Sequence, residues 1–262
     1  MDLGGRLEEI LRSIERPLVA LSGGVDSGLL YSAAVAVHPR EALGVSASTP
    51  SLSEEERESI ETTVREVGGR HRWVTTEELS DPRYRVNGGD RCFWCKEALF
   101  SAMEIVREDE GGGTLCYGET ADDAGDHRPG ATSALRRGVR APLAEVGMTK
   151  DDIRVLARAR GLSAWNRPAA PCLSSRIASG IEVTRDRLGR IEAGEALLRG
   201  EGLRILRLRD LGRAARVEVE AESTGRLLGS PRWSRIATRL AALGWEEIRL
   251  DPKGYRSGAL HE

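Results

Sequence analysis

The sequence has no long apolar run, almost no net charge and no recognisable leader. Its longest apolar runs have the length of single strands or helices, so no segment is predicted to span a bilayer. The 39 Lys and Arg residues nearly balance the 41 Asp and Glu residues, and a net charge of -2 gives no bulk attraction to nucleic acid. Residues 1–5 lack the basic and apolar regions of a signal peptide. We therefore expect a cytoplasmic protein with no membrane partner and no nucleic-acid partner.

Cysteine is also scarce, with four residues in a chain of 262. Cys92 and Cys95 form a Cys-x-x-Cys pair within Arg-Cys-Phe-Trp-Cys-Lys, residues 91–96, and this usage favours metal or redox chemistry over structural disulfides. A helix that begins here would hold both thiols on one face, near amides that lower a thiolate pKa. Together with the distant Cys172, the pair could bind three irons of a [4Fe–4S] cluster and leave the fourth iron open.

The same cysteine spacing leaves other interpretations open. A zinc site would need a fourth ligand, such as Cys116 or a histidine. Cys116 lies within a predicted strand, however, and is more typical of a small buried hydrophobe. A thioredoxin-like dithiol is a third possibility for Cys92 and Cys95, but the order of the predicted elements does not suit that fold. Glu195 and Glu218 are expected to be ordinary surface glutamates rather than metal ligands.

The clearest motif is Leu-Ser-Gly-Gly-Val-Asp-Ser at residues 21–27, between an apolar run and a helical pattern. Its two glycines allow positive φ and a close approach to an anion, and the start of a helix adds unbonded N–H groups. The spacing is neither that of a Walker A loop nor that of the dinucleotide-binding Gly-x-Gly-x-x-Gly. We predict a phosphate-binding loop with Mg²⁺ beside Asp26. The predicted phosphate ligands are Ser22, Gly23, Gly24, Asp26 and Ser27.

The wider pattern alternates strands and helices. Strands are predicted at residues 17–21, 41–47, 71–76 and 114–118, which indicates an α/β fold with a doubly wound parallel sheet. Ligands bind such sheets at the carboxyl ends of the strands. The predicted phosphate site is therefore completed by residues that follow strands: Ser48, Gly118 and Asp122.

Beyond residue 180 the pattern changes. Helices are predicted at residues 184–199 and 230–243, with strands at 203–209, 214–220 and 246–250, which is typical of a small α+β domain. We therefore predict a phosphate-binding domain at residues 1–180 and a second domain at residues 181–262, for substrate binding or oligomerisation.

Five segments together resemble a known family. They are the phosphate motif, the cysteine box at 91–96, Ala-Asp-Asp at 121–123 with Asp-His-Arg-Pro-Gly at 126–130, Pro-Leu-Ala-Glu at 142–145, and Pro-Ala-Ala-Pro-Cys-Leu-Ser-Ser-Arg at 168–176. The phosphate motif resembles the PP-loop of the ATP pyrophosphatase superfamily, whose fold is adenine nucleotide alpha hydrolase-like. The whole set resembles the LarE family, the ATP-dependent sulfur transferases that build the nickel-pincer nucleotide of lactate racemase. One segment departs, because residues 117–123 read Tyr-Gly-Glu-Thr-Ala-Asp-Asp where the family usually has Asp-Gly-Thr-Asn-x-Asp-Asp.

This resemblance implies an enzyme that uses ATP to adenylate the carboxylates of pyridinium-3,5-biscarboxylic acid mononucleotide, releases pyrophosphate, and converts them to thiocarboxylates. Some family members donate the sulfur of the cysteine at the position of Cys172, whereas others hold a [4Fe–4S] cluster through three cysteines. The three-cysteine pattern here predicts the cluster form, with Cys92, Cys95 and Cys172 as ligands. A sulfide donor and a homo-oligomer are also implied. Sacrificial transfer of the Cys172 sulfur is the alternative.

Five further residues are candidates for substrate binding. Lys96 and Arg176 could bind phosphate or the acyl-adenylate, or could be solvated charges beside the cysteines. Trp94 could stack on a flat pyridinium or adenine ring, or could belong to the core. Arg207 and Arg209 alternate along a predicted strand and would share one face, which suits a substrate with a phosphate and two carboxylates. An ordinary charged strand face is the alternative.

Two other classes of function fit the phosphate motif. An amidotransferase synthetase or a tRNA thiolase would adenylate a different acceptor, although a thiolase needs a basic RNA-binding surface. An iron–sulfur or zinc scaffold would bind a nucleotide without turnover. Release of AMP and pyrophosphate with the pyridinium substrate, and with no other acceptor, would separate these classes.

Overall fold

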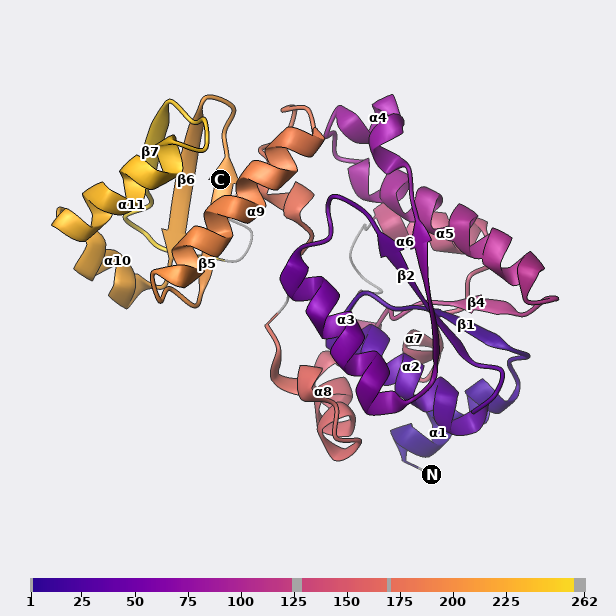
Figure 1. The fold of residues 1–262 in the computed structure, drawn as a ribbon. Coiled ribbons are helices and arrows are strands. Elements are labelled where there is room, and N and C mark those ends of the chain that lie inside the picture. Colours follow the sequence, from indigo (N-terminus) through magenta and orange to yellow (C-terminus); the bar gives the residue numbers. More distant parts are fainter. Residues whose placement is uncertain (1, 124–128, 169–170, 257–262) are drawn as a thin grey trace. The chain divides into compact units, whose positions relative to one another are not determined.

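The computed structural model describes residues 2–123, 129–168 and 171–256 (Figure 1). The chain divides into two compact units. The first comprises Met1–Glu78 and Asp90–Ala170, and the second comprises Leu79–Gly89 and Pro171–Glu262. The second unit thus begins before residue 180, and it includes an early segment that the sequence pattern assigns to the first domain.

The first unit is built on a parallel four-stranded sheet in the order β3-β2-β1-β4. Leu18 pairs with Leu43 on one side and with Leu115 on the other, so β1 is a central strand. Every residue of β1 is buried, as expected for a strand that is covered on both faces. The strands are β1 (Pro17–Ala20), β2 (Leu43–Ser48), β3 (Arg70–Thr75) and β4 (Thr114–Cys116).

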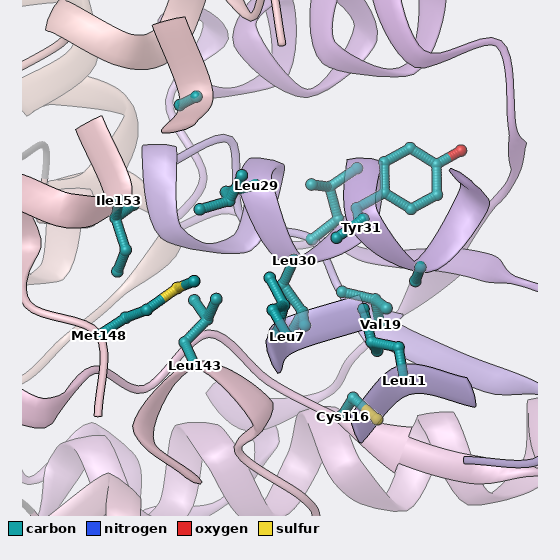
Figure 2. Packing of buried hydrophobic residues seen from close by; sticks show 14 of the residues in the cluster. Leu7, Leu11, Val19, Leu29, Leu30, Tyr31, Cys116, Leu143, Met148 and Ile153 are labelled. Carbon is teal, nitrogen blue, oxygen red and sulfur yellow. The ribbon is translucent and has the colours of Figure 1, made fainter. Parts of the chain in front are cut away.

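Helices cover both faces of this sheet. Val19 packs with α1, α2 and α8 in one hydrophobic cluster (Figure 2), whereas Leu18 packs with α5 and α6 in another. Because consecutive residues of a strand point to opposite faces, the sheet is doubly wound, and the predicted α/β architecture is confirmed. The helices are α1 (Leu3–Arg12), α2 (Val25–Val37), α3 (Glu54–Val67), α5 (Arg91–Asp109), α6 (Pro129–Arg136), α7 (Pro142–Glu145) and α8 (Lys150–Ala159).

Cys116 lies in the first of these clusters (Figure 2), where it is fully buried. Burial raises the pKa of its thiol to about 12. The interpretation of Cys116 as a small buried hydrophobe is therefore confirmed, and a neutral thiol among apolar side chains is poorly suited to bind zinc.

The second unit contains a smaller mixed sheet in the order β5-β6-β7. β5 (Leu206–Asp210) and β6 (Ala214–Val219) are antiparallel, and β7 (Glu247–Leu250) runs parallel to β6. A Cβ at Gly194 would lie 2.2 Å from a methyl carbon of Leu208, so glycine allows α9 to pack closely on β5. The helices of this unit are α4 (Pro82–Arg85), α9 (Arg185–Gly200), α10 (Ala221–Leu227) and α11 (Pro231–Ala241). The predicted α+β character is confirmed, although the sequence pattern did not indicate α10. No helix in the described ranges is both long enough and apolar enough to cross a membrane.

Candidate active site

The phosphate motif forms the turn between β1 and α2. Gly23 has a φ of 78°, and a Cβ there would lie 2.9 Å from the carbonyl oxygen of Glu56, so only glycine fits this turn. Gly24 is the N-cap of α2 and makes no side-chain capping bond. The first backbone bond of the helix runs from the N–H of Gly28 to the carbonyl of Gly24. The amides of the first turn are thus available to an anion, as the sequence predicts.

Serine hydroxyls brace this turn from within the first unit, and one of them, Ser59 on α3, donates to the carbonyl of Gly23 at 2.8 Å. The Ser27 hydroxyl is buried, donates to the carbonyl of Gly24 at 3.1 Å and accepts from the N–H of Ser22 at 3.2 Å. Ser46, on β2, donates to the carbonyl of Leu21 at 2.6 Å. Ser22 itself is exposed, with its hydroxyl 3.1 Å from that of Ser27. Of the predicted hydroxyl ligands, Ser22 is therefore the more accessible, and Ser27 also maintains the shape of the loop.

Asp26, in the first turn of α2, has two differently placed oxygens. Oδ2 forms an ion pair with Nζ of Lys150, whereas Oδ1 is buried and has no hydrogen-bond partner among the residues that the structure describes. Lys150 is the first residue of α8, and its N–H donates to Oδ2 of Asp122 at 2.7 Å. Sequence reasoning missed Lys150. The predicted cap Thr149 indicates where α8 begins, but no sequence signal indicates that this helix start lies beside Asp26.

The loop that follows β4 lies against the start of α2. A Cβ at Gly118 would be 2.9 Å from the backbone nitrogen of Ser27, so this close contact requires glycine. Asp122 is exposed in the short 3₁₀ helix Ala121–Asp123, and the carboxylate of Asp123 accepts from Thr120. Gly118 and Asp122 therefore lie close to Ser27 and Lys150, respectively, as the strand order predicts.

Ser48 lies at the carboxyl end of β2 and accepts a hydrogen bond from Arg57 at 3.0 Å. The Arg57 guanidinium in turn lies 4.6 Å from the centre of the Trp73 ring. Ser48 thus lies at the predicted edge of the sheet, and its hydroxyl is already hydrogen-bonded to Arg57 of α3.

The Cys-x-x-Cys pair lies at the start of α5, with Cys92 exposed and Cys95 half-buried. Trp94 packs edge-to-face on Phe93, and its Nε1 donates to Asp90 at 2.8 Å. The ring is half-buried and held at the surface of α5, and it is not part of either of the two hydrophobic clusters described above. As predicted, the two thiols are one helical turn apart on a helix that begins at Arg91.

Lys96 connects this helix with the end of β4. Its Nζ lies 5.7 Å from the Phe100 ring and 5.8 Å from the Tyr117 ring. Tyr117 directly precedes Gly118, the residue that contacts the start of α2. Lys96 is therefore a half-buried cation flanked by aromatic rings, not a fully solvated charge.

Cys172 belongs to the second unit, where it is half-buried at the N-cap of the 3₁₀ helix Leu173–Arg176. Arg176 is buried and pairs with Glu195 of α9, with Nε 3.0 Å from Oε1. Its Nη1 also donates to the carbonyl of Cys172 at 3.1 Å. Arg176 thus fixes the Cys172 turn to α9, and the alternative of a solvated charge is wrong.

A cluster of arginines follows on β5 and β6. Arg209 is buried and donates to Glu218 at 3.0 Å and to the carbonyl of Ser175 at 3.2 Å. Burial, and then the positive charge of Arg176, lowers the pKa of Arg207. Arg207 also lies over the ring of Tyr255. This part of the second unit favours an anion, because a negative ligand would relieve the repulsion among the guanidinium groups.

Two glutamates within this cluster correct the sequence interpretation. Glu195 and Glu218 were expected on the surface, yet their side chains are 1% and 0% exposed. Each is held by arginines, and Glu195 also accepts from the N–H of Leu208. Among the described residues, no three His, Cys, Asp or Glu side chains are gathered in a metal-binding group. The ligand set Cys92, Cys95 and Cys172 stays a prediction.

Comparison with known proteins identifies the family of this chain. A protein of Lactiplantibacillus plantarum named pyridinium-3,5-bisthiocarboxylic acid mononucleotide synthase is 30% identical over 253 residues, which are 96% of this chain and 91% of that protein. The chain belongs to the LarE family. An uncharacterised protein of Synechocystis is 34% identical over 97% of the chain and 95% of its own length. An uncharacterised protein of Methanocaldococcus jannaschii is 23% identical over 92% of the chain and 90% of its own length. No family model matches.

LarE membership confirms the resemblance that the motifs indicated. The match spans both units, so the second unit is part of the family's common chain. One segment of the resemblance, residues 126–130, lies partly outside the described residues. The departures at Tyr117, Glu119 and Thr120 have structural roles: Tyr117 and Glu119 are hydrogen-bonded to each other, and Thr120 is bonded to Asp123.

Proposed function

We propose that this protein is an ATP-dependent sulfur transferase that converts the carboxylates of pyridinium-3,5-biscarboxylic acid mononucleotide to thiocarboxylates. The name of the L. plantarum relative supports the product class. The observation that carries the proposal is the anion-binding turn at the start of α2, with the Asp26–Lys150 pair beside it.

The first half-reaction is adenylation. A carboxylate oxygen of the substrate attacks the α-phosphorus of ATP, the bond from that phosphorus to the bridging oxygen breaks, and pyrophosphate leaves. The amides of the first turn of α2 and the Ser22 hydroxyl are placed to bind the phosphates. Lys150 supplies a cation at the same turn, and Lys96 supplies a second one near the end of β4.

Mg²⁺ suits the carboxylate of Asp26. Its buried Oδ1 has no partner among the described residues, and a buried carboxylate oxygen is a hard ligand of the kind that Mg²⁺ takes together with substrate phosphates. Asp26 would hold the ion directly or through water. The ion would neutralise the charge on the pyrophosphate that leaves.

The second half-reaction is sulfur transfer. A sulfur nucleophile adds to the carbonyl carbon of the acyl-adenylate, and AMP leaves with the electrons of the carbon–oxygen bond. Cys92 and Cys95, one turn apart on α5, have the spacing of cluster ligands, and Cys172 would be the third. A bound [4Fe–4S] cluster would supply an open iron for sulfide from an external donor. The alternative is that the Cys172 thiolate attacks and then loses its Sγ by elimination of its α-proton, which leaves dehydroalanine.

The second unit would bind the anionic groups of the substrate. Arg207 is the favoured contact, because its pKa is lowered by burial and by neighbouring positive charge. The neighbouring Arg209 and Arg176 are held in place by hydrogen bonds to Glu218 and Glu195, respectively.

In the first unit, Trp94 offers a half-buried aromatic ring for stacking on a flat heterocycle.

The test is product analysis of the purified protein with ATP, Mg²⁺ and the pyridinium dicarboxylate nucleotide. We expect AMP, pyrophosphate and a thiocarboxylate once sulfide is supplied. Cys172→Ala should abolish the thiocarboxylate and leave pyrophosphate release intact, whereas Asp26→Asn should reduce both. Nucleotide binding without pyrophosphate would favour a scaffold, and turnover only with RNA or an amide donor would favour the other adenylating enzymes. Iron and acid-labile sulfide near four per chain, in protein purified without oxygen, would support the cluster over sacrificial transfer.

A further inference from the structure

The segment Leu79–Gly89 belongs to the second unit, although the chain before it and the chain after it belong to the first unit. We call this segment the excursion. It ends three residues before Cys92 in the sequence. Its partners in the second unit lie at residues 174–183, and that stretch begins two residues after Cys172. The excursion therefore joins the segment that follows Cys172 to the segment that precedes Cys92 and Cys95.

Two buried side chains hold the excursion in place. The hydroxyl of Tyr84 lies 2.7 Å from that of Ser174, and these residues are 1% and 0% exposed. The side-chain amide of Asn87, a residue that is 2% exposed, donates to the carbonyls of Ile177 at 3.3 Å and Ala178 at 2.9 Å. A buried polar group that loses its partner costs about 1–3 kcal/mol. These bonds therefore strongly favour a single register between the two segments.

The backbone is adapted to the same contact. Asn87 has a φ of 57°, a left-handed conformation that asparagine tolerates better than most residues. Its carbonyl accepts from the N–H of Gly180 at 3.2 Å, and the carbonyl of Arg85 accepts from the N–H of Val183 at 2.8 Å. A residue held in an unusual conformation by surrounding bonds indicates a functional constraint on the position of the chain.

We propose that Tyr84 and Asn87 are positioning residues that tether the Cys92–Cys95 pair to the Cys172 segment. The bonds of Asn87 fix one end of a short tether whose other end is Cys92. Without them the segment is held to residues 174–183 by fewer bonds, so the helix start that carries the pair is less constrained and the three thiols meet less often. This inference rests on the proposed function, in which the three cysteines act together.

The experiment is thiol cross-linking in the reduced, metal-free, full-length protein. A short bifunctional alkylating reagent joins Cys172 to Cys92 or Cys95, and a monofunctional reagent reports how accessible each thiol is; peptide mass spectrometry identifies the products. Cys116 does not interfere, because it is fully buried with a pKa of about 12. The ratio of the cross-linking rate to the alkylation rate measures how often the thiols meet.

Tyr84→Phe and Asn87→Gly remove the side-chain bonds, and glycine retains the positive φ. We expect the ratio to fall about fivefold for each variant, the factor that one net hydrogen bond contributes to an equilibrium. Tyr31→Phe is the matched control, because it removes a hydrogen bond of 2.9 Å from an equally buried tyrosine to the carbonyl of Arg70 within the first unit. Its ratio should equal that of the wild type.

The outcomes separate the tether from the proposed function. A wild-type protein that gives no cross-link to Cys172 would refute the three-cysteine site itself. A wild-type cross-link that persists at the same ratio in Tyr84→Phe and Asn87→Gly would overturn the tether alone. An equal fall in Tyr31→Phe would show that general loosening, and not the tether, controls the encounter.

Discussion

Lys150 Nζ is ion-paired with Oδ2 of Asp26, while Oδ1 of the same carboxylate is buried with no partner in the described part of the chain. The two residues are 124 positions apart in the sequence and meet at the start of α2. A lysine in this position can contact the phosphates of a bound nucleotide while Asp26 takes Mg²⁺. In the proposed function, the pair would therefore place Mg²⁺ and a phosphate group next to each other.

Lys150→Met should lower kcat/KM for pyrophosphate release about 10- to 100-fold, because a hydrogen bond to a charged group contributes about 1.5–3 kcal/mol. The measurement is pyrophosphate release across a titration of Mg²⁺. Lys253→Met is the matched control, since Lys253 is exposed in the second unit. Equal rates for the two variants would contradict a phosphate contact by Lys150.

Gly118→Ala should weaken ATP binding, because the added Cβ would lie 2.9 Å from the Ser27 nitrogen and would push the β4 loop away from α2. We expect the Kd for ATP to rise about 5- to 150-fold, in line with the 1–3 kcal/mol cost of overpacking a tight contact. Gly189→Ala is the control, because nothing lies within 4 Å of that position in α9. Calorimetric titration with ATP distinguishes the variants, and an unchanged Kd for Gly118→Ala would show that this contact does not shape the site.

The Arg176–Glu195 pair should dominate the stability of the second unit. Removing one partner of a buried pair leaves an uncompensated charge, so Arg176→Ala should cost about 3–5 kcal/mol of unfolding free energy. Arg226→Ala is the comparison, since its ion pair with Glu222 is exposed and should contribute less than about 1 kcal/mol. Urea unfolding measures both, and similar midpoints for the two variants would contradict a structural role for the buried pair.

The sequence predicted those features that depend on local spacing. The turn at residues 21–27, the doubly wound sheet and the helix start at Arg91 follow from glycine placement, strand–helix alternation and capping, which act within a few residues. Lys150 could not be found this way, because its role depends on Asp26, which only the fold brings near. Glu195 and Glu218 were misplaced for the same reason: their burial is compensated by arginines on other elements.

The excursion Leu79–Gly89 shows a further limit. Its sequence is polar and turn-rich, so it has no periodicity that would assign it to the second unit. Its placement depends on a few buried bonds made by Tyr84 and Asn87 with residues far along the chain. Single buried polar contacts leave almost no trace in a hydrophobic pattern.

His71 should make the stability of the first unit depend on pH. Its Nε2 lies 2.9 Å from the Ser46 hydroxyl, which donates to the carbonyl of Leu21 just before the phosphate loop. Burial lowers the pKa of His71, with the charge of Glu61 opposing the shift. The unfolded chain therefore binds the proton more readily, so this contribution is present above the unfolded pKa of about 6.5 and is lost as pH falls toward the lower folded pKa.

Urea unfolding of wild type and His71→Gln between pH 7.5 and 5.5 tests this dependence. Glutamine can still donate to Ser46 but does not titrate, so its unfolding free energy should decline less over this range. Carboxylates with a lowered pKa, such as those of Glu97 and Glu145, lose their contribution only at more acidic pH. A wild-type slope in His71→Gln would show that the imidazole beneath the phosphate loop does not govern the pH response.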